Sequence, residues 1–299
     1  MSEFNNGGSI RVQQISKLLG DLDFDVKTVN RKQARRILNQ DETWNLVVIS
    51  SYSCASLGRL ARLKTDFLWF DPYDSWTKSR ISLFSSGSLM HLVLLLRDVF
   101  YTEIFPKTEL VTFLTQAEAT AQSRFCRKRL LKIMPLIPVA PLLKQDSTPR
   151  IVFVGDGSYK PNRQCLRFLD ELGLALFEKI SVIGKGYPHK KSFKNIEWLG
   201  YQSDSELYKE GDIHLAPISL GAGIKTKVVI PLMLGLPVVV FPELAQPFKN
   251  LPNLWTAKTP SEFATIIRSH KGYTATFEIN LDIYVLNEVN EVSALLERI

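Results

Sequence analysis

The sequence predicts an α/β protein with two parallel-sheet domains, and three observations carry this prediction. The chain has 299 residues, which suits two domains of about 150 residues better than one. It is 45% hydrophobic and 22% charged, so it can bury cores and is neither disordered nor fibrous. Short apolar runs typical of strands alternate along it with segments of helical period, an order typical of parallel sheets.

The first half of the chain predicts five strands and five helices before a linker. The segment 135–150 is rich in proline, which removes backbone donors and restricts its neighbours, so we interpret it as a linker. Before it, we expect helices near 9–20, 31–40, 55–64, 86–104 and 116–125, and strands at 25–29, 45–50, 66–70, 109–114 and 130–134.

The second half begins again with a clear strand. Strands are expected at 150–155, 179–184, 195–200, 212–217 and 236–241, and helices near 163–176, 204–210, 224–234, 260–270 and 285–298. We therefore predict two Rossmann-like domains, 1–140 and 150–285, and a last helix in 286–299 that packs back on the first. Two such domains would face a cleft, and ligands would bind at the carboxyl ends of the strands.

The charge of the chain is uneven. Its formal net charge is +7, and the first 149 residues hold 20 basic and 14 acidic side chains. Such an excess suits an anionic partner, such as a membrane surface or an anionic acceptor, or it is a solvated surface. No nucleic-acid module accompanies it, so we expect no nucleic-acid partner. One basic cluster supplies much of the excess and would face lipid phosphates or solvent: Arg124, Arg127, Lys128, Arg129 and Lys132.

Cysteine usage and hydropathy indicate the compartment. Cys54, Cys126 and Cys165 are widely spaced and form no CxxC, which disfavours a disulfide framework or a zinc site and favours a reducing cytoplasm. The polar start lacks the apolar core of a signal peptide. The apolar segment 89–96 is too short to span a bilayer and predicts a buried helix or a membrane-facing one. We therefore expect a cytoplasmic protein, or one peripheral at the inner membrane face.

Two glycine-rich segments follow predicted strands of the second half. The first, GDGSYK at 155–160, is similar to the dinucleotide fingerprint, but Lys160 replaces its third glycine and no acidic residue follows to hold a ribose. A redox dinucleotide is therefore disfavoured. The backbone of Ser158, Tyr159 and Lys160 would still present N–H groups to a phosphate.

The second glycine-rich segment, GAGIKTK at 221–227, opens a helix and predicts a diphosphate site. Glycines allow close backbone approach, and a helix start supplies free N–H groups and a positive dipole end. The alternative is a helix cap with two solvated lysines. Gly7 and Gly8 make a weaker site of the same kind before the first helix. The predicted site comprises Gly221, Ala222, Gly223, Ile224, Lys225, Thr226 and Lys227.

Two aspartates follow the predicted strand 66–70. Asp71 and Asp74 would lie at its carboxyl end, where a catalytic or acceptor-binding carboxylate is expected. The alternative is a polar turn, DPYD, whose aspartates cap the following helix. The four histidines are scattered, and we see no clustered metal ligands.

Taken together, these segments resemble the GT-B glycosyltransferases of group 1 (family 4). Three blocks carry the resemblance in order: VGDGSYKPNRQCLRFL at 154–169, NIEWLGYQSDSELYKEGDIHLAP at 195–217, and GAGIKTKVVIPLMLGLPVVV at 221–240. The first half is similar more thinly, through GGSIRVQQISKLL at 7–19 and DPYD at 71–74.

The resemblance implies a glycosyltransferase that uses a nucleotide-diphosphate sugar and retains the anomeric configuration, with no metal or other cofactor. The donor would bind the second domain, with contacts that include Gly200 and Tyr201 and with its diphosphate against the 221–227 segment. Lys225 and Lys227 would offset the charge on the leaving diphosphate. Gly7 and Gly8 would approach the phosphates from the first domain. That domain would hold a hydroxyl acceptor, such as a polysaccharide, a glycan, or an anionic or lipid-linked precursor.

The sequence departs from this family at two places. The family's Glu-x7-Glu pattern, whose second Glu grips the donor ribose, falls on Ala222 and Ile230. Glu243, after the next strand, is a candidate substitute. The strand that usually precedes the Gly-Gly loop is missing, so we expect a shortened first domain. These departures favour the alternative of a non-catalytic homologue that binds a sugar, a nucleotide or a partner subunit, and more weakly that of an inactive fragment.

Overall fold

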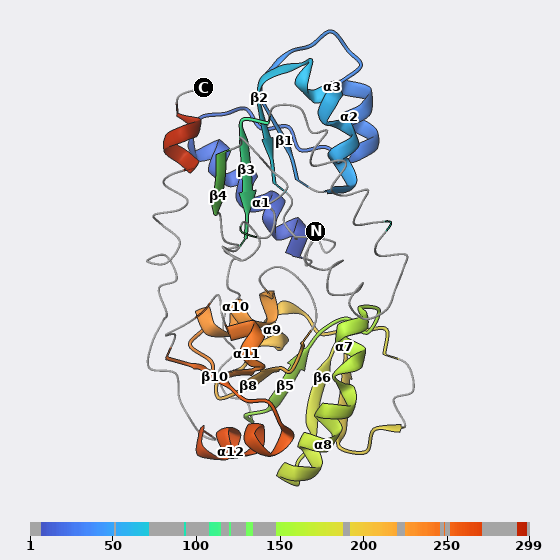
Figure 1. The fold of residues 1–299 in the computed structure, drawn as a ribbon. Helices are drawn as coiled ribbons and strands as arrows, with labels where there is room; N and C mark the ends of the chain where they lie inside the picture. Colours follow the sequence, from blue (N-terminus) through green and yellow to red (C-terminus); the bar gives the residue numbers. More distant parts are fainter. Residues whose placement is uncertain are drawn as a thin grey trace. The chain divides into compact units, whose positions relative to one another are not determined.

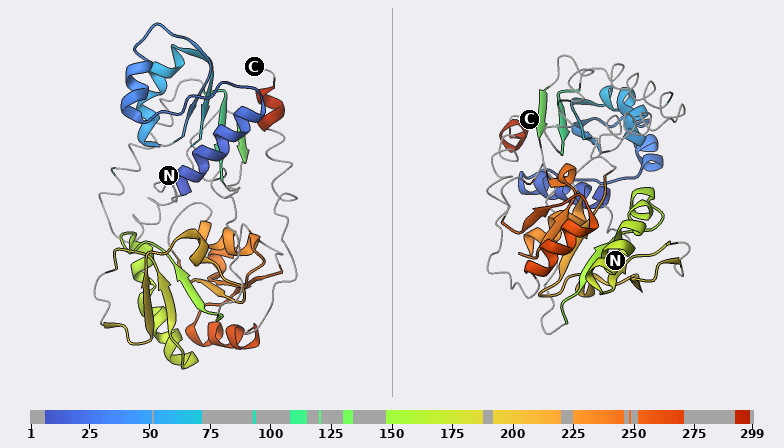
Figure 2. Two further views of the ribbon diagram at one scale, coloured as in Figure 1. Left: turned by 180° about the vertical axis from the view of Figure 1, so that it is seen from behind. Right: turned by 60° about the horizontal axis from the view of Figure 1, so that its bottom comes forward.

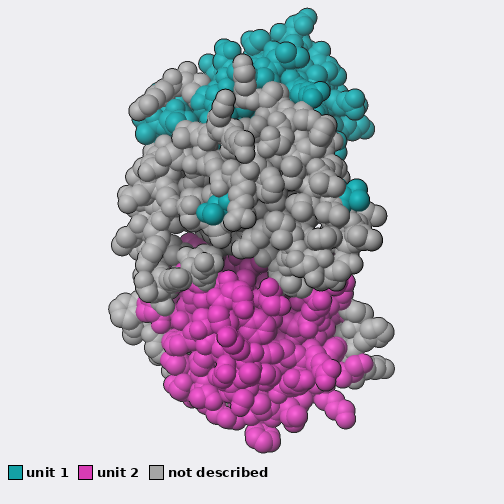
Figure 3. All heavy atoms as spheres, viewed as in Figure 1, with its two compact units in different colours: residues 1–137, 221–224, 282–299 teal, residues 138–220, 225–281 magenta. Residues whose placement is uncertain are grey.

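The computed structural model divides the chain into two compact units (Figure 3). Unit 1 comprises residues 1–137, 221–224 and 282–299, and unit 2 comprises 138–220 and 225–281. The structure describes residues 7–50, 52–71, 93, 108–114, 120, 130–133, 148–187, 192–219, 225–245, 248, 252–270 and 292–297.

Unit 1 is built on a parallel sheet of four described strands, in the order β1-β2-β3-β4 (Figure 1). The strands are β1 (Trp44–Ile49), β2 (Thr65–Phe70), β3 (Leu110–Phe113) and β4 (Leu130–Ile133). The described helices are α1 (Gly7–Asp21), α2 (Arg31–Ile37), the 3-10 helix η1 (Tyr52–Leu57) and α3 (Gly58–Arg62).

Successive side chains of β2 bury opposite faces of this sheet, as the period of a strand requires. On one face Leu68 and Phe70 pack into a cluster with Leu38, Leu57 and Ala61, from or beside α2, η1 and α3. On the other face Trp69 is buried by α1 and by the helical residues 292–296, through the side chains of Ile15, Leu19, Val292 and Leu296. The two faces are therefore closed by different segments, which Figure 2 shows from behind.

The expected strand at 25–29 is wrong. Residues 24–30 form no regular structure, although Phe24 and Val26 pack beside the α1 cluster. Phe24 and Val26 alternate with the exposed Asp25 and Lys27, and they are half-buried although this backbone forms no strand. β1 instead pairs directly with β2.

The expected helices at 86–104 and 116–125 lie outside the described residues, except for two helical positions. One is Val93, which is exposed, so at this position the segment 89–96 does not form the buried helix that we expected. The other is Thr120. Within the described part of the chain, no helix has the length and hydropathy needed to cross a membrane.

A buried ion pair joins α1 to the end of β2. Arg11 and Asp71 are both fully buried, and the Arg11 guanidinium donates from Nε to Asp71 Oδ2 at 2.9 Å and from Nη2 to Oδ1. The Thr112 hydroxyl of β3 also donates to Oδ1, and Trp69 Nε1 donates to that hydroxyl at 2.8 Å. The two-pronged arginine geometry satisfies the carboxylate and fixes α1 on the sheet.

Unit 2 holds a parallel sheet of six described strands, in the order β10-β9-β8-β5-β6-β7. The strands are β5 (Ile151–Val154), β6 (Ile180–Ile183), β7 (Ile196–Gly200), β8 (Ile213–Ala216), β9 (Val238–Val240) and β10 (Leu254–Thr256). The described helices are α7 (Lys160–Gln164), α8 (Leu166–Leu176), α9 (Asp204–Leu207), α10 (Thr226–Met233), α11 (Pro242–Ala245) and α12 (Pro260–His270).

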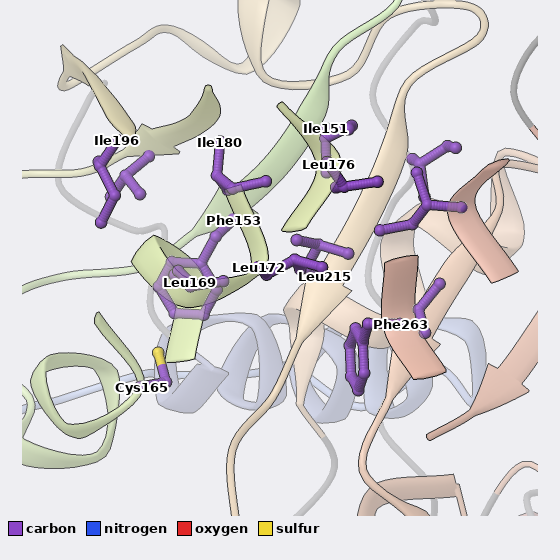
Figure 4. Packing of buried hydrophobic residues seen from close by; sticks show 14 of the residues in the cluster. Ile151, Phe153, Cys165, Leu169, Leu172, Leu176, Ile180, Ile196, Leu215 and Phe263 are labelled. Atoms are coloured by element: carbon purple, nitrogen blue, oxygen red, sulfur yellow. The ribbon is translucent and has the colours of Figure 1, made fainter. Parts of the chain in front are cut away.

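The main core of unit 2 lies between the sheet and the helices α8 and α12, which pack side by side (Figure 1). Leu169 and Leu172 of α8 and Phe263 of α12 are fully buried there, with Phe153 of β5 among them (Figure 4). The Phe263 ring packs edge-on against Phe168, with 5.0 Å between their centroids. Aromatic packing of this kind adds to the apolar burial.

Three local features of unit 2 were not predicted. The helix expected near 163–176 is divided at Cys165 into α7 and α8. The short helix α11 begins at Pro242, the short strand β10 begins two residues after Pro252, and neither is long enough to show a periodicity. The elements α11 and β10 were missed because a segment of three or four residues carries too little pattern.

Replacing Arg11 by Met should leave the Asp71 carboxylate buried without its cation. Losing one partner of a buried ion pair costs about 3–5 kcal/mol, so we expect a loss of that size in the free energy of unfolding, measured by urea denaturation. Arg11→Met combined with Asp71→Leu should recover most of it. Arg167→Met, which breaks an exposed pair with Glu171, is the control and should cost about 0.5 kcal/mol or less. Equal losses in the two single variants would contradict the role of the pair.

Candidate functional site

The candidate site lies at the carboxyl ends of β5 and β8, which are neighbours in the unit 2 sheet. From β5 the chain continues to β6 on one side, and from β8 it continues to β9 on the other. Because crossovers are right-handed, the two following helices lie on opposite faces of the sheet. Open parallel sheets bind ligands at such a switch point.

The loop after β5 is held against the loop after β6. The backbone N–H of Gly155 donates to Ile183 O at 2.9 Å, and that of Gly157 donates to Lys185 O at 2.7 Å. The Tyr187 hydroxyl donates to Gly155 O at 2.9 Å. Burial raises the pKa of Tyr187, so its hydroxyl keeps its proton and remains a donor. These bonds fix the course of the loop.

Two glycines permit this close approach. A Cβ on Gly184, which has φ +148°, would lie 1.7 Å from Gly155 O. A Cβ on Gly155 would lie 2.6 Å from Asn162 Nδ2 and 2.9 Å from Lys227 Nζ. No larger residue fits at either position without moving its neighbours.

The polar groups of this loop bond mainly within the protein. The Ser158 N–H donates to Asp156 Oδ1 at 2.7 Å, a bond that lowers the pKa of the Asp156 carboxyl. The Tyr159 N–H donates to Asp156 O, and Arg163 Nη1 donates to the carbonyls of Gly157 and Ser158. The loop is therefore rigid, and its N–H groups at 157–159 already have acceptors. Its predicted contact with phosphate stays a prediction.

Lys227 joins the two sides of the switch point. It belongs to α10, and its ammonium donates to Asn162 Oδ1 of α7 at 2.7 Å and lies 4.5 Å from the centre of the Phe153 ring. The Asn162 amide in turn donates to Asp156 O at 2.8 Å. Burial lowers the pKa of Lys227 to about 7, and the Lys225 charge adds to this effect.

Among the described residues, no carboxylate lies within ion-pair distance of the Lys227 ammonium. Its only hydrogen-bond acceptor in this part of the chain is the amide oxygen of Asn162. A half-buried amine with a lowered pKa and no carboxylate within ion-pair distance among the described residues is suited to an anion brought by a ligand.

The start of α10 is described from Lys225 onward. Lys225 is half-buried and precedes the helix, and no acidic residue occupies the first turn. Thr226 is half-buried as well. The predicted residues Gly221, Ala222, Gly223 and Ile224 lie outside the described residues. The described part of the predicted diphosphate site is thus a helix start with two lysines.

The other predicted site residues are dispersed. Gly200 ends β7 with φ +68°, and Tyr201 beside it is largely exposed. Lys160, the first residue of α7, is also exposed. Ile230 is half-buried in α10, and Glu243 is exposed in α11.

In unit 1, Gly7 and Gly8 are the first residues of α1. Asp71 lies inside the buried pair with Arg11, and both of its oxygens accept hydrogen bonds there. This is the geometry of a structural carboxylate, and the predicted catalytic role of Asp71 has no support from it. Asp74 lies outside the described residues, as do the side chains of the basic cluster at 124–132.

The sequence analysis did not single out two residues that hold the candidate site together, Asn162 and Tyr187. Asn162 was visible only as part of the PN dipeptide after the glycine loop, and Tyr187 had no sequence signal at all. In the portion that the structure describes, no three His, Cys, Asp or Glu side chains cluster as metal ligands would.

Most of the chain is similar in structure to solved glycosyltransferases, although no protein-family model and no curated protein sequence matches it. HepE of Anabaena, solved with UDP and glucose, superposes with a TM-score of 0.62 at 15% identity, over 90% of this chain and 82% of HepE. Sucrose-phosphate synthase of Thermosynechococcus elongatus gives 0.58 at 12% identity, over 85% and 72%. Trehalose 6-phosphate synthase of Burkholderia multivorans gives 0.53 at 9% identity, over 96% and 75%.

These similarities cover both units and confirm the predicted fold class. The chain is an α/β protein with parallel sheets and has the GT-B fold of these proteins. At such low identity the likeness concerns the fold, and the chemistry has to be argued from the residues described above.

Replacing Gly184 by Ala should destabilise unit 2 and disturb the loop after β5, because the new methyl group would meet Gly155 O. Gly200→Ala is the matched control, since Gly200 also has positive φ but has open space around it. We expect Gly200→Ala to cost about 1 kcal/mol of backbone strain and Gly184→Ala to cost clearly more, measured by thermal unfolding. Equal costs would show that the contact with Gly155 does not constrain the loop.

The stability of the protein should depend on pH through Lys227. Its folded pKa of about 7 lies below the ordinary lysine pKa of 10.5, so between these two pH values the unfolded chain binds a proton that the folded chain does not. The free energy of unfolding should therefore fall as the pH falls from about 10 to about 7. Lys227→Met should abolish this part of the pH dependence, and Lys258→Met, at an exposed lysine, should not. Parallel pH profiles of the wild type and Lys227→Met would contradict the assignment.

Proposed function

We propose that the protein is a glycosyltransferase that moves a sugar from a nucleotide-diphosphate sugar to a hydroxyl acceptor. The observation that carries the proposal is the junction of Lys227 with Asn162, which joins α10 to the loop after β5 at the switch point. The GT-B fold shared with HepE and the two synthases supports it.

In this proposal the diphosphate binds at the start of α10. Lys225 and the helix dipole offset the negative charge that develops on the leaving diphosphate. Lys227 supplies a second cation, and its bond to Asn162 holds α10 at a fixed distance from the loop after β5. Tyr201, exposed beyond β7, offers a ring on which a base can stack.

The finer features of the activity rest on the family resemblance of the motifs. We propose retention of the anomeric configuration and a hydroxyl acceptor on a polysaccharide, a glycan or a lipid-linked precursor. The net charge of +7 favours an anionic acceptor. We also propose a cytoplasmic protein, peripheral at the inner membrane face, that uses no metal ion.

A second candidate function is a non-catalytic homologue that binds a nucleotide, a sugar or a partner subunit. Ile230 favours it, because an apolar side chain at the position of the family's ribose-binding Glu accepts no hydrogen bond from a ribose. Glu243 follows β9 at the same edge of the sheet. If the protein is an enzyme, we propose that this carboxylate binds the donor ribose in place of the family's Glu.

Nucleotide binding by the full chain tests the proposal. HepE was solved with UDP, so UDP and UDP-sugars are the first probes in a thermal-shift panel that also includes ADP and GDP. A ligand at 100 times its Kd should add about 2.7 kcal/mol of stability. Lys225→Ala should weaken binding at least about tenfold, because an ion-paired cation is lost, whereas Lys258→Ala should bind like the wild type.

Turnover separates the two candidate functions. Release of UDP from a UDP-sugar in the presence of an acceptor supports the enzyme, and Glu243→Gln should then raise the KM for the donor. Nucleotide binding without any turnover favours the non-catalytic homologue. A chain that no nucleotide stabilises at millimolar concentration would overturn the glycosyltransferase and would leave, of the second candidate, only a homologue that binds a sugar or a partner subunit.

A further inference from the structure

The outer surface of α2 is strongly cationic, and no expected site accounts for it. The helix has the sequence RKQARRI, so four of its seven residues are basic and none is acidic. Arg31, Lys32, Arg35 and Arg36 are all exposed. We call these four residues the α2 basic surface.

Helix geometry places the four basic residues together. At about 100° per residue they fall within an arc of about 140°. Ala34 lies outside this arc, and Leu38 caps the end of the helix; both pack into the apolar cluster with η1 and α3. The α2 basic surface therefore faces away from the core of unit 1.

The structure fixes this helix firmly. Asn30 forms a capping box with Gln33, each side chain accepting from the backbone N–H of the other at 3.0 Å. Arg31 Nη2 donates to Ser56 Oγ of η1 at 3.1 Å, and α2 lies beside α3 (Figure 1). The cationic array is thus displayed on a rigid element.

The charges of the α2 basic surface are uncompensated in the described part of the chain. None of its four residues has a carboxylate within ion-pair distance among the described residues. The acidic residues that follow the helix are Asp41 and Glu42, and Asp41 lies 3.8 Å from Lys64 instead. Arg59 on α3 is a further exposed cation in the same layer.

We propose that the α2 basic surface binds the anionic headgroups of a lipid bilayer. Several fixed cations without counter-charges match a surface of many mobile anions, and each contributes about a fivefold gain in affinity there. Leu63, which ends α3 and is 78% exposed, supplies an apolar side chain next to this layer that a bilayer accommodates and a soluble polyanion does not.

Vesicle sedimentation of the full chain tests the proposal. The protein should sediment with vesicles of phosphatidylglycerol and phosphatidylcholine, should stay in the supernatant with phosphatidylcholine alone, and should be released by salt. Arg35→Gln with Arg36→Gln should lower the partition coefficient about twenty-five-fold, the product of two lost charges. Far-ultraviolet circular dichroism of each variant checks its folding.

The control removes the same charge elsewhere. Lys179→Gln with Lys258→Gln, both exposed in unit 2, should lower partitioning far less. An equal loss in the two double variants would assign the binding to net charge and overturn the proposal. So would a wild-type chain that ignores anionic vesicles, including one that binds the soluble polyanion heparin instead.

Discussion

The close contact between two backbone segments is the constraint on which unit 2 depends. Gly155 and Gly184 directly follow the neighbouring strands β5 and β6. A Cβ on Gly184 would collide with Gly155 O, and a Cβ on Gly155 would meet the side chains of Asn162 and Lys227. The contact positions Asn162, and Asn162 accepts the bond from Lys227 that brings α10 to the switch point. A ligand site at this edge thus inherits its geometry from the packing of two glycines, with little contribution from side-chain flexibility.

Unit 1 is organised by charge where unit 2 is organised by backbone contact. The Arg11–Asp71 pair lies at the carboxyl end of β2, the position where a parallel sheet would ordinarily present a reactive carboxylate. Here the carboxylate instead holds α1. Arg11 and Asp71 belong to the two segments of the first half that resemble the family, 7–19 and 71–74, and their ion pair gives both residues a structural role.

Most of the sheet architecture could be predicted, and the site could be predicted only in part. Runs such as 151–154 and 213–216 are continuously apolar because both faces of a parallel strand are buried, so the strands were evident. The strand predicted at 25–29 does not form, because the apolar side chains of this run are half-buried without strand pairing. Lys227 was expected to face phosphate, but its bond to Asn162 spans 65 positions of sequence, and no local pattern reveals such a partner. The Arg11–Asp71 pair escaped prediction for the same reason.

The sheet of unit 1 is closed on one face by segments from both ends of the chain. Ile15 and Leu19 come from α1, while Val292 and Leu296 come from the last helical turn described. During synthesis, Trp69 emerges more than two hundred positions before its neighbours Val292 and Leu296, and Leu110 emerges about one hundred and eighty positions before them. The apolar face of unit 1 therefore stays uncovered until unit 2 has been synthesised, and the unit that is translated first is the last to complete its core. During that interval the exposed apolar face is accessible to a chaperone or a membrane surface.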